Sequence, residues 1–161
     1  NVVGGLVGRK PVTEQDEAWY NFLMDVNMKS VFLCTREVVP LMTNGGSIIN
    51  FSSQAARDGG GPGASMYATA KAAVMCHTRA MAKELGPVGI RVNALAPGMI
   101  ATSFHDRFTN PAARENLEKT VPLRRQGAAS DIADLVAYLA SDESSYITGT
   151  NIDINGGALF S

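Results

Sequence analysis

Short apolar segments alternate with longer helix-like segments along this chain. Residues 47–52, 90–95 and 150–154 read as strands, because each is short, contains buried-type residues such as Ile, Val or Leu, and is bounded by turn-forming residues. Residues 65–85 and 130–140 have helical patterning and lie between these strands. Since parallel strands need a long crossover, usually a helix, the alternation predicts an α/β fold with a parallel sheet.

The segments around this framework have their own signals. A helix is expected to begin at Thr13, with Asp16 completing a pair close to a capping box, and to end before Asn44-Gly45-Gly46. Residues 54–64 are expected to form a loop. Residues 99–127 are expected to hold one or two short helices and to form a mobile flap over a site.

Composition limits the classes of function. The 161 residues suffice for one domain and are too few for two ordinary ones. With 45% hydrophobic and 18% charged residues and a net charge of −1, the chain fits a soluble globular protein without a nucleic-acid or membrane partner. No apolar run approaches the ~20 residues of a membrane span, and no signal peptide opens the chain, so we expect a cytoplasmic protein.

The cysteines and histidines do not indicate a metal site. Cys34 and Cys76 lie in helix-like, partly apolar segments and are expected to be reduced core residues, with a disulfide between them as the alternative. His77 and His105 are far apart, and no metal-ligand spacing occurs among Cys, His, Asp and Glu. We expect no metal site.

A tyrosine and a lysine lie four residues apart, Tyr67 and Lys71, and are expected on one face of the helix over 65–85. A phenol with a pKa near 10 transfers protons poorly at neutral pH. A neighbouring ammonium favours the phenolate and lowers the tyrosine pKa, which suits general acid–base catalysis. The pair alone is a weak signal, because an ordinary exposed helical pair has the same spacing.

The chain resembles the short-chain dehydrogenase/reductase family through five elements in the family's order, spread over essentially the whole chain. They are Asn27 in Asp25-Val-Asn27, Ser52-Ser53 at a strand end, Tyr67-x-x-x-Lys71, Asn93-Ala-Leu-Ala-Pro97-Gly98, and Asp153-Ile-Asn-Gly-Gly157. The resemblance implies a Rossmann-like, doubly wound parallel sheet of about seven strands, of which this chain would supply the last three.

The first half of that family fold has no counterpart in this sequence. The family's Thr-Gly-x-x-x-Gly-x-Gly turn is not found, nor is the residue after the second strand that selects NAD or NADP. Asn1-Val-Val-Gly4 resembles the family's Asn-Asn-Ala-Gly motif, so that motif's cofactor roles carry over to Asn1 and Gly4. We therefore expect residues 1–161 to be a single partial domain carrying the catalytic and substrate-binding half, a truncation that lacks the first strands and the glycine-rich turn.

The resemblance also implies catalytic roles. Tyr67 would be the general acid in carbonyl reduction and the base in the reverse reaction, with hydride supplied by the nicotinamide of NAD or NADP. Lys71 would lower the Tyr67 pKa and hold the nicotinamide ribose. Ser53 would hydrogen-bond to the reacting oxygen. Asn27 would break its helix locally and hold a water that links Lys71 to solvent.

Several alternatives stay open for these residues. Ser53 competes with Ser52 and Ser65 for the role of catalytic serine. Ser53 lies fourteen residues before Tyr67, where the family more often has thirteen, a difference that one extra residue in the loop over 59–63 would explain. Asn27 could be a capping residue without a proton relay.

By the same resemblance, the turn after the second strand would contact the nicotinamide through Pro97, Gly98, Ile100 and Thr102, with a simple strand-ending turn as the alternative. In the flap that follows, His105 and Arg107 could meet an acidic substrate or form a solvated face.

The predicted function is that of an NAD(P)-dependent oxidoreductase that interconverts a carbonyl and a secondary alcohol of a small molecule. The family commonly pairs the helices over 28–43 and 65–85 across a two-fold axis, so a homodimer or homotetramer is expected. The nearest resemblances are to bacterial carrier-protein reductases and to sugar or sugar-acid reductases. Three stretches resemble keto-uronate reductases: Gly4-Gly-Leu-Val-Gly-Arg-Lys10, Arg57-Asp58-Gly-Gly-Gly and Phe104-His105-Asp106. The alternatives are a non-catalytic fragment or oligomerisation module of such an enzyme, and relatives that epimerise or dehydrate.

Overall fold

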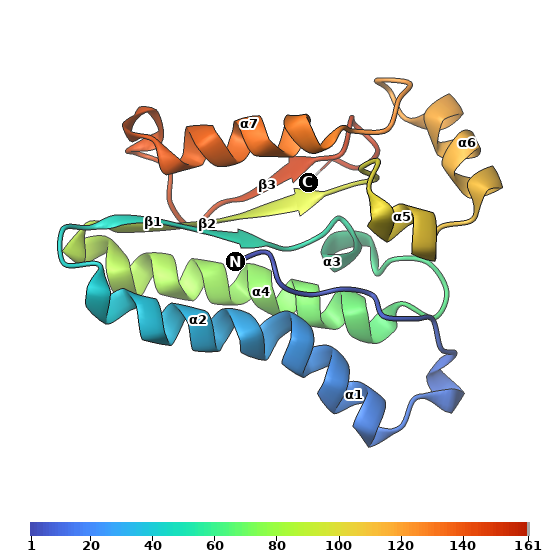
Figure 1. The fold of residues 1–161 in the computed structure, drawn as a ribbon, viewed down its shortest axis with the longest axis horizontal. Helices are drawn as coiled ribbons and strands as arrows, with labels where there is room; N and C mark the ends of the chain where they lie inside the picture. Colours follow the sequence, from blue (N-terminus) through green and yellow to red (C-terminus); the bar gives the residue numbers. More distant parts are fainter. Residues whose placement is uncertain (161) are drawn as a thin grey trace.

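A parallel sheet lies between two helical layers (Figure 1). The computed structural model describes residues 1–160. Within them, the strands β1 (Gly46–Phe51), β2 (Ile90–Pro97) and β3 (Asn151–Ile154) follow the order β1-β2-β3, and both neighbouring pairs are parallel. Helix α4 (Ser65–Leu85) covers one face of the sheet, and α7 (Ala129–Ala140) covers the other. The predicted α/β fold with a parallel sheet is confirmed.

The central strand β2 is buried along most of its length. Val92, Ala94, Leu95 and Ala96 are fully buried, because helices pack on both faces and a strand pairs along each edge. This explains why β2 reads as a nearly continuous run of small and apolar residues rather than as an alternating pattern.

The first residues of the chain run beside the sheet. The amino group of Asn1 donates to the Ile49 carbonyl at 2.9 Å, and the Phe51 N–H donates to the Asn1 carbonyl at 3.1 Å, so this segment pairs with the edge of β1 away from β2. Residues 1–10 then follow the first half of α4 toward the loop that joins α3 to α4 (Figure 1). There the Lys10 N–H donates to the Gly63 carbonyl at 3.1 Å.

A nearly continuous helical arm precedes β1. It consists of α1 (Glu17–Met24), the π-helical turn η2 (Asp25–Lys29), α2 (Ser30–Val38) and the 3₁₀ turn η3 (Val39–Leu41), after an isolated 3₁₀ turn η1 (Val12–Glu14). The predicted helix start at Thr13 is wrong. The helix begins at Glu17, and Asp16 is its N-cap, with a side chain that accepts from the Trp19 N–H at 2.7 Å.

The remaining elements surround the carboxyl ends of the strands. The segment predicted as a loop over 54–64 contains the one-turn helix α3 (Ala55–Asp58). The predicted short helices of the flap are α5 (Ser103–Phe108) and α6 (Pro111–Thr120). The 3₁₀ turn η4 (Gly86–Val88) follows α4, and the 3₁₀ turn η5 (Asp142–Ser144) follows α7.

The structure also tests the predictions about the cysteines and about membrane spans. Cys34 and Cys76 are free and exposed, so the prediction that they are core residues is wrong, although the prediction of reduced thiols agrees with the structure. None of the helices in residues 1–160 combines the length and the hydropathy that a membrane span requires.

Candidate active site

A cavity of about 540 Å³ opens at the carboxyl ends of β1 and β2, where ligands bind in parallel α/β sheets. The predicted site residues that line it are Gly4, Ser53, Tyr67, Lys71, Pro97, Gly98, Ile100 and Thr102. Asn1 and Asn27 do not line it. The fold thus gathers residues from the first segment, two strand ends and α4 around one space.

Tyr67 and Lys71 project from the first turns of α4 and are both buried, with 9% and 4% of their surface exposed. The Lys71 Nζ donates to the Phe51 carbonyl at 2.9 Å and lies 5.9 Å from the centroid of the Tyr67 ring. Burial lowers the pKa of Lys71 to about 8, because the desolvated ammonium is disfavoured.

The Tyr67 pKa moves opposite to the sequence-based expectation. Burial disfavours the phenolate and raises the pKa of Tyr67, while the neighbouring Ser53 side chain, which hydrogen-bonds to it, lowers the pKa by less. Spacing along a helix predicted an effect of Lys71, whereas desolvation dominates in the folded chain. The Tyr67 phenol therefore keeps its proton at neutral pH.

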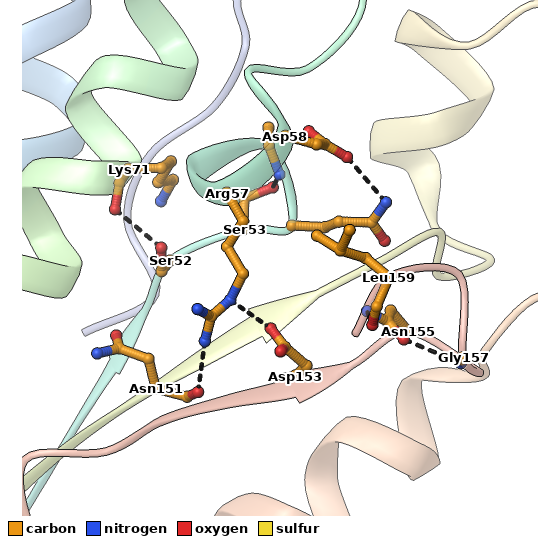
Figure 2. A network of polar contacts seen from close by, with 12 residues as sticks. Ser52, Ser53, Arg57, Asp58, Lys71, Asn151, Asp153, Asn155, Gly157 and Leu159 are labelled. Atoms are coloured by element: carbon orange, nitrogen blue, oxygen red, sulfur yellow. Dashed lines mark hydrogen bonds and ion pairs between the residues drawn. The ribbon is translucent and has the colours of Figure 1, made fainter. Parts of the chain in front are cut away.

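The two candidate serines have different partners. The Ser52 Oγ donates to the Lys71 carbonyl (Figure 2), at a distance of 2.8 Å, and Ser52 is buried. The Ser53 Oγ instead accepts from the Ala55 N–H at 3.2 Å. The Ser53 side chain is also the one that lowers the pKa of the Tyr67 hydroxyl. The Ser52 hydroxyl ties β1 to α4, and the Ser53 hydroxyl is the one beside the tyrosine.

Asn27 occupies the π-helical turn η2 and is fully buried. The Ser30 N–H skips one residue and donates to the Asp25 carbonyl, so the Val26 carbonyl accepts from the Ser30 Oγ at 3.0 Å instead. The predicted local break at Asn27 is thus a π turn, a feature that often occurs at functional sites. An ideal Cβ on Gly4 would lie 2.5 Å from the Asn27 Oδ1 and 3.1 Å from the Lys71 Nζ.

The turn after β2 is held closely by its neighbours. The Gly98 N–H donates to the Ile154 carbonyl at 3.1 Å, and an ideal Cβ on Gly98 would lie 2.7 Å from the Asn155 Cβ. The flap continues from this turn and covers Tyr67: the rings of Phe104 and Tyr67 are 6.2 Å apart.

His105 also lines the cavity, and its Nδ1 lies 2.8 Å from the Thr109 Oγ1. Burial lowers the pKa of His105, so the imidazole is largely neutral at pH 7. Of the two predicted flap residues, His105 is therefore the one at the cavity.

An ion pair fixes the wall that carries Ser53. The Arg57 Nε donates to Asp153 Oδ1 at 2.7 Å, and an Arg57 Nη donates to the Asn151 carbonyl at 2.8 Å (Figure 2). These contacts anchor α3 on β3. The sequence did not predict these contacts, because α3 itself was not predicted. Of the further cavity residues, Arg9 and Asp58 were quoted only within stretches that resemble keto-uronate reductases, without a role, and Gln54 was not singled out.

Comparison with known proteins agrees with this architecture. The family model described as enoyl-(acyl carrier protein) reductase matches residues 1–158. A 3-oxoacyl-(acyl-carrier-protein) reductase of Thermotoga maritima is 43% identical over 148 residues, which cover 91% of this chain and 59% of that relative. An uncharacterized short-chain type dehydrogenase/reductase of Sinorhizobium fredii is 40% identical over 153 residues, 93% of this chain and 60% of the relative.

This chain belongs to the short-chain dehydrogenase/reductase family. Among solved members, an NADH-dependent reductase responsible for alginate metabolism superposes with a TM-score of 0.86 at 32% identity, covering 99% of this chain and 63% of that one. A 3-oxoacyl-(acyl-carrier protein) reductase from Brucella melitensis with bound NAD gives a TM-score of 0.89 at 34% identity, covering 100% and 61%. The chain thus spans about three fifths of the length of the relatives it matches.

Proposed function

We propose that the protein is an NAD(P)-dependent oxidoreductase that interconverts a carbonyl and a secondary alcohol, with Tyr67 as general acid and base. The observation that carries the proposal is a buried, protonated tyrosine beside the Ser53 hydroxyl and one helical turn from Lys71, all on one cavity at the strand ends. Membership of a family whose relatives are named reductases supports it.

The residues around the cavity fit a nicotinamide cofactor. Gly4 has a φ of +137° and no side chain, which keeps open the space next to Asn27 and Lys71. Pro97, Gly98, Ile100 and Thr102 form the opposite wall. We propose that these two walls hold the nicotinamide half of NAD or NADP, with Lys71 at its ribose; the bound cofactor supplies the hydride.

In the reduction, Tyr67 donates its phenolic proton to the substrate oxygen, while Ser53 donates a hydrogen bond to the same oxygen as negative charge develops there. Lys71, with a pKa near 8, can return a proton toward the tyrosine. Asn27 keeps the first segment and the π turn in place beside Lys71. In the oxidation each proton moves the other way.

The proposal also covers the assembly of the protein. Exposed apolar residues gather on α1 and α2, among them Phe22, Phe32, Leu33 and Val38, which supports a homodimer or homotetramer formed through the helical arm. An oligomerisation module would use the same surface, but it gives no reason for a buried lysine and a buried tyrosine that face a cavity, which are costly to keep in a module that only assembles.

A substrate panel tests the proposal. The protein, expressed from its complete reading frame, is assayed with NADH and with NADPH against a keto-uronate, a neutral keto sugar and acetoacetyl thioester. Turnover of at least one carbonyl, with Tyr67→Phe inactive on it, is expected. Absence of turnover on the whole panel, together with no nicotinamide fluorescence change up to millimolar cofactor, would contradict the proposal.

A further inference from the structure

The chain turns sharply where it enters the cavity wall. Val7 has a φ of +63°, and the Gly8 N–H donates to the Leu6 carbonyl at 2.7 Å, so Leu6, Val7 and Gly8 form a γ-turn of the strained hand. A positive φ is unfavourable for a β-branched residue, and such strain persists where the surrounding structure imposes it, often at ligand sites. The turn leaves Leu6 buried near Tyr67 and brings Arg9 to the cavity.

The Arg9 side chain is held by the loop that leads into α4. Its Nη1 donates to the Pro62 carbonyl at 2.9 Å. An ideal Cβ on Gly61 would lie 3.2 Å from that nitrogen, and one on Gly63, whose φ is +77°, would lie 3.0 Å from the Arg9 Cβ. The glycines of this loop therefore make room for Arg9, and the loop fixes the direction of the guanidinium.

Arg9 is left without an acidic partner in the described part of the chain. None of the ion pairs within residues 1–160 includes it. Asp58 is the acidic residue on the same cavity, and both of its oxygens are engaged: Oδ1 accepts from the Gly60 N–H at 2.8 Å and Oδ2 from the Gln54 Nε2 at 3.0 Å. Arg9 is exposed at the edge of the cavity, so its remaining donors face solvent and are free for a ligand.

We propose that Arg9 binds a carboxylate of the substrate, which makes the substrate class keto acids; this rests on the oxidoreductase function proposed above. A guanidinium held at one nitrogen still offers donors that match the planar carboxylate. Asp58, which lines the same cavity, repels any anion, and it repels a doubly charged phosphate about twice as strongly as a singly charged carboxylate. The Arg9 contact would set the orientation in which the keto carbon faces Tyr67 and Ser53.

The kinetic test compares an open-chain keto-uronate with its methyl ester, in which the carboxyl group has lost its negative charge and gained a methyl group. Arg9→Gln is expected to lower kcat/KM for the acid by roughly 10- to 100-fold, the range of a charge-assisted hydrogen bond, and to leave the ester nearly unchanged. Arg79→Gln, an exposed arginine on α4, is the matched control and should change neither substrate. Equal effects of Arg9→Gln on acid and ester, or a wild-type preference for the ester or for acetoacetyl thioester, would overturn the inference.

A binding test separates this inference from the reductase proposal. D-glucuronate and D-glucose are titrated calorimetrically into the wild-type protein and Arg9→Gln. Saturable binding of glucuronate alone, lost in Arg9→Gln, supports the carboxylate site even if no carbonyl on the panel is reduced, a result that would count only against the reductase function. If wild-type protein binds no glucuronate, or the variant binds it equally well, Arg9 has no such role.

Discussion

Asn27 and Gly5 exchange two hydrogen bonds: the Gly5 N–H donates to the Asn27 Oδ1 at 2.9 Å, and the Asn27 Nδ2 donates to the Gly5 carbonyl at 3.0 Å. The same Nδ2 also donates to the Leu23 carbonyl at 2.9 Å. A buried side chain thus pairs with the main chain as a strand would. It joins the first segment to the π turn at the point where Lys71 lies.

Asn27→Ala should therefore destabilise the protein. The substitution removes the partners of the half-buried Gly5 N–H and carbonyl, and it removes the bond to the Leu23 carbonyl, which together costs about 2 kcal/mol of unfolding free energy. Urea denaturation measures this loss. A relay through Asn27 additionally predicts a slower turnover in the folded variant at pH 8 and above; unchanged turnover would leave Asn27 with its positioning role alone.

Gly4→Ala tests how closely Gly4, the Asn27 side chain and the Lys71 Nζ pack together. The added methyl group would overlap the Asn27 Oδ1 and crowd the Lys71 Nζ, at a φ that L residues rarely adopt. We expect a loss of about 2 kcal/mol in stability and weaker cofactor binding. Gly86→Ala is the control, because φ there is −55° and an added Cβ meets nothing within 4 Å. Equal stabilities of the two variants would contradict the packing described.

Substitutions of Ser52 and Ser53 should have different effects, one on stability and the other on turnover. Ser52→Ala removes a buried hydrogen bond to the Lys71 carbonyl and should cost about 1 kcal/mol of stability with little effect on kcat. Ser53→Ala should keep the stability and lower kcat by roughly 100-fold. Since Ser53 lowers the Tyr67 pKa, its removal should also shift the pH profile of alcohol oxidation upward. The reverse pattern would make Ser52 the catalytic serine.

The buried, charged Lys71 side chain should lower the unfolding free energy of the protein at neutral pH. Its pKa is about 8 in the folded protein against 10.5 for an unperturbed lysine, so the unfolded chain binds more protons between these values. Stability then rises with pH from about 8 to 10.5, and below pH 8 the full cost of the buried charge remains.

Lys71→Met should accordingly raise the unfolding free energy at pH 7, by up to the order of 3 kcal/mol, and the gain should shrink as pH rises toward 10.5. Turnover and cofactor affinity should both fall, since two roles are proposed for Lys71. Lys83→Met, exposed on the same helix, is the control. Loss of turnover alone would remove the proposed ribose contact.

Periodicity and turn residues predicted the framework well. The helix over 65–85 has the predicted bounds, and each strand lies within one or two residues of its prediction, because their apolar patterns match the layers that bury them. Helix α3 was missed, since four residues are too few for a periodic pattern. The interruption at Asn27 was visible in the sequence, but the sequence could not show that its side chain pairs with the main chain of Gly5, a contact across 22 positions.

The sequence predicted which residues meet at the site better than it predicted their chemistry. The ordered motif indicated which residues meet, and the cavity contains most of them. Spacing could not predict that desolvation raises the Tyr67 pKa, because burial follows from packing of α4 against the sheet and the flap. Arg9 was likewise unassigned, since its position depends on the Pro62 carbonyl, 53 positions away.

Tyr67→Phe, compared with Tyr146→Phe at a fully exposed position, tests the central claim most directly. Each variant is titrated with NADH and NADPH by nicotinamide fluorescence and then assayed for carbonyl reduction. We predict that Tyr67→Phe binds the cofactor with nearly wild-type affinity and loses roughly 100- to 10,000-fold in kcat, while Tyr146→Phe changes neither. Wild-type turnover in Tyr67→Phe, or a loss explained entirely by weaker cofactor binding, would contradict its role as general acid.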